Sequence, residues 1–300
     1  MKVPLRRIPK LLLAQVYTRN ALVQSLITRF PERRLDRPIF ILGLPRSGTS
    51  IFCTLFGENR HVAHWSEAPV VWDPRWRDRE QDHRWTAAHA TPENLRRINN
   101  NFAYYTKLKG QTRFVNKHPR NALRVPFLMA GWPDARLIHV RRDPRAVANS
   151  LITITRAEKH RQRYPLGQFA RPEGWREINA LPDDVERFSR MVLGIDETLT
   201  EDLKAVPAER LFEIRYEDFA ADVHGSLRRA WGFSELPVDE GALRRVPERL
   251  ENRNYKWAKT RTPQEQATMH RILGDLVVAR GYEPDVHWLD RARAAATAGV

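Results

Sequence analysis

A glycine-rich turn joins an expected strand to an expected helix in the first fifth of the chain. The strand is the apolar run PIFILGL, residues 38 to 44, and the helix begins at Thr49. Four residues separate Gly43 from Gly48, which is the frame of a phosphate-binding loop. Backbone N–H groups in such a loop and the N-terminus of the following helix bind anions. The sequence therefore predicts an anion site here.

The side chains of this loop differ from those of nucleotide triphosphatases. In those enzymes a Lys after the second glycine reaches the outer phosphates. Here Thr49 stands at that position, and Arg46 places its cation inside the loop instead. The loop is thus suited to phosphate but lacks the main cation of a kinase or an ATPase. A divergent kinase remains an alternative, and it would need magnesium and a carboxylate to hold that ion.

A second turn between a strand and a helix carries three arginines. The strand ARLIHV, residues 135 to 140, is followed by RRDPR and by a helix that contains Ser150. Arg142 and Ser150 are eight residues apart, so both can face one anion only if it lies along the helix. Solvated or salt-bridged arginines are the alternative. Together the two turns indicate a ligand with phosphates at two separated places, without the Gly-x-Gly-x-x-Gly pattern of a dinucleotide fold.

The two turns resemble those of the P-loop sulfotransferases, most closely the bacterial, carbohydrate and tyrosyl-protein group with a Pro-Arg-Ser-Gly-Thr loop. The resemblance covers about residues 38 to 282. It implies that the donor is 3′-phosphoadenosine 5′-phosphosulfate (PAPS), that Arg142 and Ser150 bind its 3′-phosphate, and that Tyr216, in the segment RYED, lies near its adenine. The residues that would bind the 5′-phosphosulfate are Pro45, Arg46, Ser47, Gly48, Thr49 and Ser50.

Sulfuryl transfer to a hydroxyl or amine needs an in-line acceptor, a base for its proton and cations near the leaving phosphate. Sulfate carries less charge than phosphate, so we expect no metal. The resemblance implies that Arg46 and Lys117 are the cations. Two residues compete for the base. Glu67 lies where related enzymes place a catalytic Glu, whereas His118 follows the matching Lys directly, without the residue that intervenes in cytosolic sulfotransferases. His has the better starting pKa and Glu would need a raised one. We favour Glu67, and the alternative role for His118 is to cap a helix.

A further donor contact is expected near the C-terminus. The segment NYKW, residues 254 to 257, resembles the Ser-Lys-Trp stretch of the tyrosyl-protein branch, with Tyr255 in place of the Ser. Lys256 is therefore expected on the 3′-phosphate. A surface Lys beside a buried Trp257 is the alternative.

Aromatic residues and histidines crowd the segment after the first helix of the expected domain. They are Trp65, Trp72, Trp76, Trp85, His61, His64, His83 and His89. Aromatic walls suit a small-molecule, carbohydrate or lipid acceptor, and we expect it here and at the Pro- and Gly-containing segment 158 to 183. Packing of an irregular subdomain is the alternative. No metal site is expected, because no two histidines have a helical i, i+4 spacing with a carboxylate partner.

The elements between these motifs alternate. Strands are expected at 38–44, 112–116, 135–140 and 210–214, and helices at 49–56, 91–108, 120–130, 143–152, 184–203 and 219–231. Strands separated by helices require crossover connections, so the fold class is α/β, with one P-loop-type domain whose mainly parallel sheet has helices on both faces. Ligands should bind at the carboxyl ends of the strands. The domain is expected over residues 38–300, after a basic amphipathic helical segment over residues 1–37.

Composition limits the function classes. The 300 residues carry a formal net charge of +15, but most basic clusters are interleaved with acids and no nucleic-acid-binding motif appears. We therefore expect small anionic ligands and no nucleic-acid partner. A non-catalytic nucleotide- or polyanion-binding protein remains the alternative from another class. The single cysteine, Cys53, excludes a disulfide framework within the chain and favours a reducing, cytoplasmic location.

The N-terminal segment raises the question of membrane contact. No apolar run approaches the roughly 18 residues that a spanning helix needs. The first acid of the chain is Glu32, and the residues before it include six Lys or Arg and a series of apolar side chains. We expect this segment to pack on its own domain, and peripheral contact with a membrane surface is the alternative.

Overall fold

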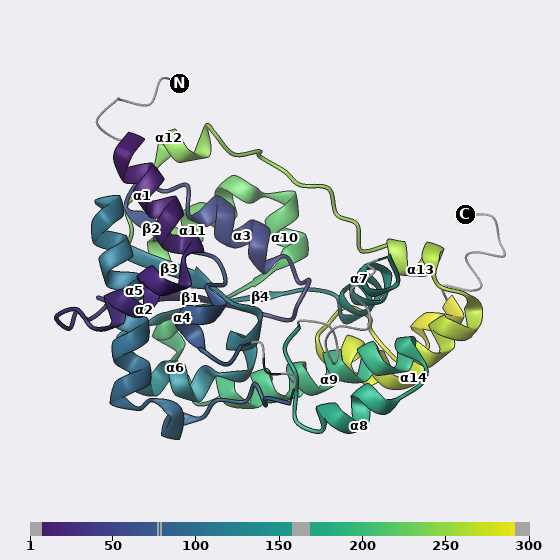
Figure 1. Cartoon of the computed structure of the whole chain (residues 1–300). Coiled ribbons are helices and arrows are strands. Elements are labelled where there is room, and N and C mark those ends of the chain that lie inside the picture. Colours follow the sequence, from purple (N-terminus) through teal and green to yellow (C-terminus); the bar gives the residue numbers. More distant parts are fainter. Residues whose placement is uncertain (1–7, 77, 79, 158–168, 292–300) are drawn as a thin grey trace.

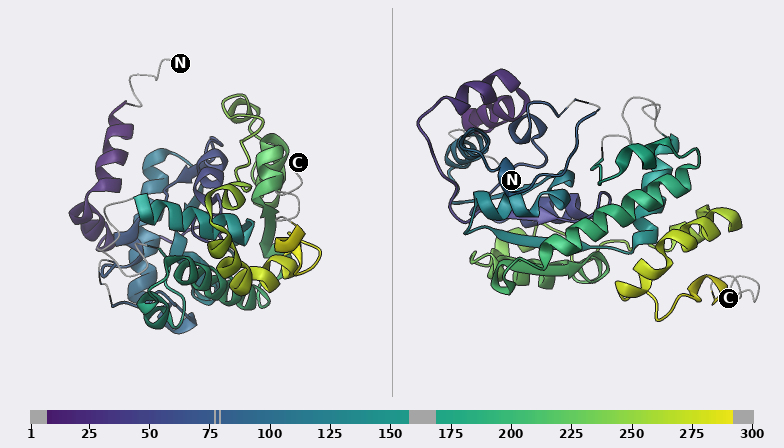
Figure 2. Two further views of the ribbon diagram at one scale, coloured as in Figure 1. Left: turned by 90° about the vertical axis from the view of Figure 1, so that its right-hand side faces the viewer. Right: turned by 90° about the horizontal axis from the view of Figure 1, so that it is seen from below.

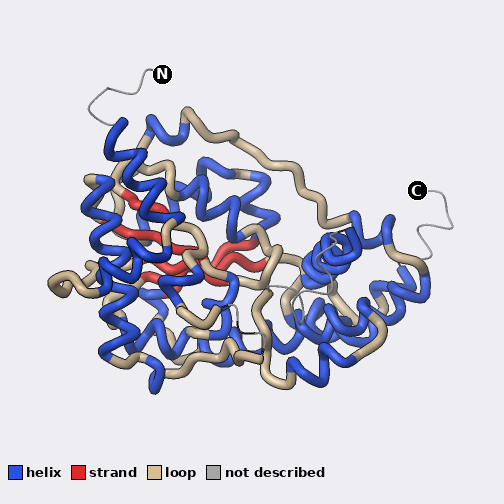
Figure 3. The backbone as a smooth tube through the Cα atoms, in the orientation of Figure 1, coloured by secondary structure: helices blue, strands red, loops and turns tan. Residues whose placement is uncertain are grey.

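The computed structural model describes residues 8–76, 78, 80–157 and 169–291. Its centre is a sheet of five strands in the spatial order β2-β3-β1-β4-β5, and every pairing is parallel. The strands are β1 (Ile39–Leu42), β2 (Val62–His64), β3 (Arg113–Lys117), β4 (Arg136–Arg141) and β5 (Leu211–Arg215). Figures 1 and 3 show the sheet between helices. The expected α/β fold with helices on both faces is confirmed.

The central strand shows why the sheet is covered on both sides. All four residues of β1 are buried, with Ile39 and Ile41 in one core and Phe40 and Leu42 in the other. Such a continuous apolar run is typical of a strand inside a parallel sheet. The first core receives side chains from three main helices, α3 (Thr49–Phe56), α10 (Tyr216–Ala221) and α11 (Val223–Phe233).

The second core contains more residues than the first. Its helices lie on the opposite side of the sheet from α10 and α11 (Figure 2). Its principal helices are α4 (Pro69–Trp72), α5 (Pro92–Lys109), α6 (Val125–Gly131), α7 (Pro144–Ala157), α9 (Asp184–Leu203) and α14 (Pro263–Ala279). The shorter helices α8 (Trp175–Ala180), α12 (Glu240–Leu243) and α13 (Lys256–Thr260) complete the connections. In Figure 1, α7, α8, α9, α13 and α14 form the half of the molecule away from α5.

Three expected helices are each divided by a local polar residue or a proline. The helix expected at 120–130 is a 3₁₀ turn, η3 (Pro119–Leu123), followed by α6. Pro126 has no backbone N–H and is therefore accommodated in the first turn of a new helix, α6. The helix expected at 219–231 is interrupted at Asp222, whose side chain caps α11 by accepting the N–H of Gly225. The N-terminal segment is likewise two helices, α1 (Ile8–Arg19) and α2 (Ala21–Thr28), with Asn20 capping the second.

Two other assignments need completion. The expected loop at 158–183 contains α8 in its described part, and residues 158–168 lie outside the described residues. Helix α14 was not expected, although Thr262 and Glu265 form a capping box at its start. Within the described residues, no helix is both long and apolar enough to cross a membrane.

Two consecutive asparagines of α5 hold the N-terminal helices against the rest of the chain. The Asn100 amide accepts the Arg33 N–H at 2.8 Å and donates to the Phe30 carbonyl at 3.0 Å. Asn101 accepts the Tyr17 hydroxyl at 3.1 Å. Both asparagines are buried, so their own amide groups depend on these bonds. The boundary between residues 37 and 38 falls after this anchored segment and stays a prediction.

We predict that Asn100→Leu lowers the free energy of unfolding by roughly 1–3 kcal/mol, because it removes the hydrogen bonds that join residues 30 and 33 to α5. Urea unfolding measures this directly. Gln264→Leu, which changes an exposed amide on α14, is the matched control and should have little effect. Equal unfolding free energies for the Asn100 variant and the unaltered protein would contradict the anchoring role.

Candidate active site

The phosphate loop lies where β1 ends and α3 begins, and its two glycines permit close contacts. Gly43 has φ 150° and Gly48 has φ 91°. A Cβ on Gly48 would lie 2.3 Å from the Tyr216 ring, and one on Gly43 would lie 2.5 Å from the Val140 carbonyl oxygen. Neither position can hold a side chain, so the loop backbone is packed directly against the end of β4 and against Tyr216.

The loop residues combine free polar groups with a strained arginine. Ser47 is buried, and its hydroxyl has no hydrogen-bond partner among the described residues. Pro45 and Thr49 are also buried, whereas Ser50 is exposed at the start of α3. Arg46 has φ 70°, a left-handed conformation that a residue with a Cβ rarely adopts. Since the first N–H groups of α3 have no intrahelical acceptors, they and the Ser47 hydroxyl suit an anion.

The second expected anion turn is in contact with the first. The Arg46 Nε donates to the Ser150 hydroxyl at 3.2 Å, and the Arg142 guanidinium donates to the Arg46 carbonyl at 2.8 Å. Arg142 also lies 4.5 Å from the centre of the Tyr216 ring. The structure thus brings together Arg46, Arg142, Ser150 and Tyr216, which the resemblance assigns to three parts of one ligand.

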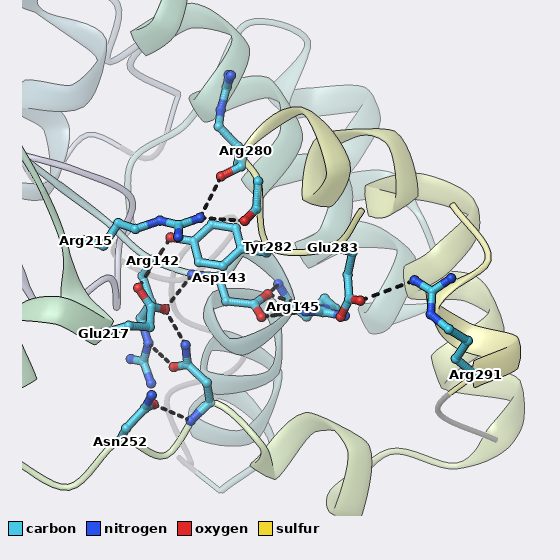
Figure 4. A network of polar contacts seen from close by, with 12 residues as sticks. Arg142, Asp143, Arg145, Arg215, Glu217, Asn252, Arg280, Tyr282, Glu283 and Arg291 are labelled. Carbon is cyan, nitrogen blue, oxygen red and sulfur yellow. Dashed lines mark hydrogen bonds and ion pairs between the residues drawn. The ribbon is translucent and has the colours of Figure 1, made fainter. Parts of the chain in front are cut away.

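Arg142 is held in place by a polar network that sequence reasoning missed. Its Nε donates to the Asn254 side-chain oxygen at 2.9 Å, and the Asn254 amide donates to Glu217. Glu217 also accepts the backbone N–H of Asp143 at 3.1 Å and lies 3.4 Å from the Tyr282 hydroxyl (Figure 4). Burial lowers the pKa of Arg142, although its nearest acids oppose this effect. Only the positions of Glu217 inside RYED and of Asn254 at the start of NYKW could have indicated these residues.

The other arginines of the second turn have structural partners. Arg145 is buried and forms ion pairs with Asp143 at 2.8 Å and Glu283 at 2.7 Å. Its guanidinium also lies over the ring of Trp257. Arg141 donates to the Arg280 carbonyl. The alternative of salt-bridged arginines is therefore correct for Arg145, and Arg142 is the member of this group that contacts the phosphate loop.

Lys256 begins α13, which lies against α7. The Thr260 hydroxyl donates to the Asn149 side chain at 2.9 Å, which ties α13 to the residue before Ser150. Among the contacts of the described residues, none joins the Lys256 ammonium to Ser150 or to Arg142. The expected role of Lys256 on the 3′-phosphate stays a prediction.

The proposed cation and base meet at the end of β3. Lys117 is the last residue of β3 and pairs in register with Ile41 of β1. Its Nζ lies 2.8 Å from the Glu67 Oε1, and the Glu67 backbone N–H donates to the Lys117 carbonyl at 2.6 Å. The Lys117 side chain is 5% exposed, whereas that of Glu67 is 53% exposed. The pair therefore has a buried cation and an accessible carboxylate.

The turn that carries Glu67 is strained and clamped. Glu67 and Ala68 both have positive φ, 65° and 51°, and such conformations cost on the order of 1–3 kcal/mol each. The buried Asn116 holds this turn from both sides, because its amide donates to the Trp65 carbonyl at 2.6 Å and accepts the Trp72 indole N–H at 3.1 Å. Asn116 is a positioning residue that sequence reasoning did not identify.

His118 has the geometry of a helix cap. Its Nδ1 accepts the backbone N–H of Arg120 at 3.1 Å, at the start of η3. Burial, with smaller effects of Arg124, Arg120 and Lys117, lowers the pKa of His118 well below its usual value. The ring is therefore neutral near pH 7, and with Nδ1 accepting, its proton resides on Nε2.

The aromatic segment is mostly interior. Trp65, Trp72 and Trp85 belong to the second core, so packing accounts for these three side chains. The placement of the acceptor beside them stays a prediction. In the described part of the chain, no group of three His, Cys, Asp or Glu residues could hold a metal ion. Cys53 is buried, and burial raises its pKa to about 12, which makes it a poor nucleophile.

The assembled site has two adjacent turns that suit anions and, at the neighbouring strand end, a Lys and Glu pair. This arrangement suits the transfer of a group from a donor with two phosphates to an acceptor that must lose a proton.

Comparison with known proteins agrees with this geometry. The sequence profile of the sulfotransferase family matches residues 38–240. A curated relative from Mycobacterium bovis, omega-hydroxy-beta-dihydromenaquinone-9 sulfotransferase, is 28% identical over 171 residues, which are 56% of this chain and 41% of the relative. Its counterpart from Mycobacterium tuberculosis matches equally. The chain thus spans less than half the length of these relatives.

Two solved structures share the fold. The sulfotransferase domain from the curacin biosynthetic pathway has a TM-score of 0.53 at 15% identity, covering 81% of this chain and 98% of that domain. A sulfotransferase from Mycobacterium tuberculosis has a TM-score of 0.50 at 17% identity, covering 77% of this chain and 78% of its own. Because the family profile matches well over half of the 300 residues and includes both arginine-containing turns, the chain belongs to the sulfotransferase family.

Proposed function

We propose that the chain transfers the sulfuryl group of PAPS to a hydroxyl, or an amine, of a small-molecule, sugar or lipid acceptor. The observation that carries this proposal is the 2.8 Å contact between Lys117 and Glu67 beside the phosphate loop. A protein that only binds nucleotides or polyanions has no need of an accessible carboxylate at this position. A kinase would need a Lys where the chain has Thr49.

The donor is assigned to the two turns. The loop from Pro45 to Ser50 would bind the 5′-phosphosulfate, and Arg142 with Ser150 would bind the 3′-phosphate. Tyr216 would contact the adenine, since its ring lies between Gly48 and Arg142. Support comes from the unpartnered Ser47 hydroxyl in the loop and from the network that fixes the Arg142 guanidinium.

The transfer step balances as an in-line displacement. The acceptor oxygen attacks sulfur while the S–O bond to the 5′-phosphate breaks, and the electron pair of that bond remains on the phosphate oxygen. The acceptor proton passes to the Glu67 carboxylate, and the products are a sulfate ester and adenosine 3′,5′-bisphosphate. Arg46 and Lys117 stabilise the charge on the leaving phosphate, a role worth on the order of 100- to 1000-fold in rate for one donor. No metal enters this step.

Glu67 suits the base better than His118. The Glu67 carboxylate is accessible and its backbone is held over the end of β3, whereas the imidazole is buried and its Nδ1 is already occupied. Lys117 can leave Glu67 for the leaving oxygen when the donor binds, which frees the carboxylate at the moment a base is needed. His118 then serves to cap η3.

A lipid alcohol is the acceptor class that the curated relatives favour, since their name specifies a hydroxylated menaquinone. The N-terminal helices add a reason to place the chain at a membrane surface from the cytoplasmic side. Large apolar side chains are exposed on them, and no acid precedes Glu32. These exposed side chains are Leu13, Val16, Leu22, Leu26 and Phe30. Apolar contact and attraction to anionic lipids would act together.

We predict that Glu67→Gln lowers kcat by roughly 100- to 10,000-fold with little change in the affinity for PAPS, because the amide cannot accept the proton. The measurement is the rate at which adenosine 3′,5′-bisphosphate appears in the presence of hydroxylated lipid and sugar acceptors. Glu197→Gln, an exposed carboxylate on α9, is the matched control. An unchanged kcat in the Glu67 variant would move the base elsewhere.

Arg142→Ala should weaken binding of adenosine 3′,5′-bisphosphate by roughly 10- to 100-fold, as expected for loss of a charged hydrogen bond. The affinity of the Arg142→Ala variant for adenosine 5′-phosphate should equal that of the unaltered protein, because this ligand lacks the 3′-phosphate. Calorimetric titration at constant salt gives both affinities, and Arg96→Ala on the exposed surface of α5 controls for net charge. A loss that is equal for both ligands would show that the two turns are wrongly assigned.

If α1 and α2 contact a membrane, the protein should co-sediment with phosphatidylglycerol vesicles and should co-sediment much less with phosphatidylcholine vesicles. Replacing Leu22 and Leu26 together by Glu should abolish it, since both side chains are exposed and belong to the contact. The double change of Val238 and Val286 to Glu, exposed elsewhere, should not. Identical sedimentation of the two double variants would contradict contact through α1 and α2.

A further inference from the structure

Near the catalytic pair, where Trp76 and Trp85 contact η3, lies a buried group of hydrogen-bond donors that have no partners among the described residues. Arg124 is fully buried, and neither of its terminal nitrogens, Nη1 and Nη2, has a hydrogen-bond partner among the described residues. Its remaining nitrogen, Nε, lies 3.4 Å from the His83 carbonyl, and its guanidinium stacks 3.9 Å from the centre of the Trp85 ring. Stacking covers the face of the guanidinium and leaves its donor edge unused.

Two neighbours of Arg124, His83 and Asn121, also have buried polar atoms without a hydrogen-bond partner among the described residues. The His83 Nδ1 accepts the backbone N–H of Arg171 at 3.0 Å, so its Nε2 carries the proton, and this Nε2 is buried without a partner in the described chain. The Asn121 carbonyl accepts the Arg124 N–H at 3.1 Å, which places both residues in one turn. The Asn121 side-chain amide is also buried with no described partner. Donors therefore predominate among the unpartnered atoms.

The charge around these donors is positive. Arg120 and Arg171 are buried close by and use their guanidinium groups on the carbonyls of Trp76 and Gln81. Two acids act on Arg124 from the described residues, the buried Asp73 and the exposed Asp82. The Asp73 carboxylate already accepts from Gln81 and the backbone.

An unpaired charge taken out of water costs several kcal/mol. Burial accordingly lowers the pKa of Arg124 to about 9, with a further contribution from Arg120. An anion at this position would remove the cost of burying the charge and satisfy the donors at once.

Asn121 and Arg124 of this group follow β3, whose last residue is Lys117. His118 connects the group to the catalytic pair, because His118 follows Lys117 directly and its carbonyl accepts the Asn121 N–H at 3.0 Å. The donor turns lie after β1 and β4, whereas these donors follow β3, so they are distinct from the residues assigned to the phosphates of PAPS.

We propose that Arg124, His83 and Asn121 form a binding site for an oxyanion, a carboxylate or a phosphate. The oxyanion is either a group of the acceptor or a free anion that the fold requires. Its assignment to the acceptor rests on the proposed sulfuryl transfer, and the existence of the site does not.

The test is the melting temperature of the full chain as sodium acetate or sodium phosphate replaces sodium perchlorate at constant ionic strength. Adenosine 3′,5′-bisphosphate is kept in excess so that the donor turns are occupied, and its binding is first confirmed by calorimetry. The site predicts a rise of at least about 2 °C for the unaltered chain. Failure to bind the bisphosphate would reject the proposed function and leave the anion titration to be performed alone.

Two variants separate this site from general screening of a basic protein. Arg124→Met, of similar length, should abolish the rise and leave the melting temperature in perchlorate equal or higher, because it removes an unpaired buried charge. Arg113→Met is the matched control, since Arg113 is equally buried but donates to the carbonyls of Arg37 and Ser234. It should lower the melting temperature and keep the rise.

The proposal is overturned if the unaltered chain shows no rise, or if Arg124→Met retains it. Asn121→Leu provides a second variant should the first not fold, and it should reduce the rise at least by half. A comparison of ligands identifies the source of the oxyanion. If an ω-hydroxy fatty acid raises the melting temperature at a lower concentration than acetate does, and its methyl ester does not raise it, the site belongs to the acceptor. If acetate and the hydroxy acid give the same rise at equal concentrations, the site binds a free anion.

Discussion

The hydrogen-bonded register of β3, β1 and β4 fixes where Lys117, the phosphate loop and the turn of Arg142 lie relative to one another. Ile41 of β1 pairs with Lys117 on one side and with Ile138 on the other. The phosphate loop therefore begins beside Lys117, and the turn that carries Arg142 follows a strand in the same register. A shift of one residue would turn each side chain to the opposite face of the sheet, which burial on both faces prevents.

Contacts of the loop backbone and of amide side chains then orient the charged groups that the strands bring together. Gly48 allows the Tyr216 ring to touch the loop, and Tyr216 in turn supports the Arg142 guanidinium. Amide side chains orient the charged groups, with Asn254 holding Arg142 and Asn116 holding the strained turn of Glu67. Neutral amides can fix a charged side chain without neutralising it, which leaves its charge available to a ligand.

Much of this could be predicted from the sequence, because strand and glycine patterns are local. The parallel sheet follows from the crossover rule. The positions of the two turns, at the ends of β1 and β4, follow from short motifs. The contacts of Asn116 and Asn254 could not be predicted, since each depends on a partner distant in the chain. The breaks at Arg124 and Asp222 were missed because apolar periodicity continues across them, while a proline or a capping side chain decides the boundary.

The measurement that tests the central claim most directly is a calorimetric titration of the unaltered chain at fixed, moderate salt. It compares adenosine 3′,5′-bisphosphate, adenosine 5′-phosphate and magnesium-ATP, and it needs no acceptor. Two joined anion turns that bind the ends of PAPS predict clear preference for the bisphosphate. Preference for magnesium-ATP, or equally weak and salt-sensitive binding of all three, would contradict the account and favour a kinase or a polyanion-binding protein.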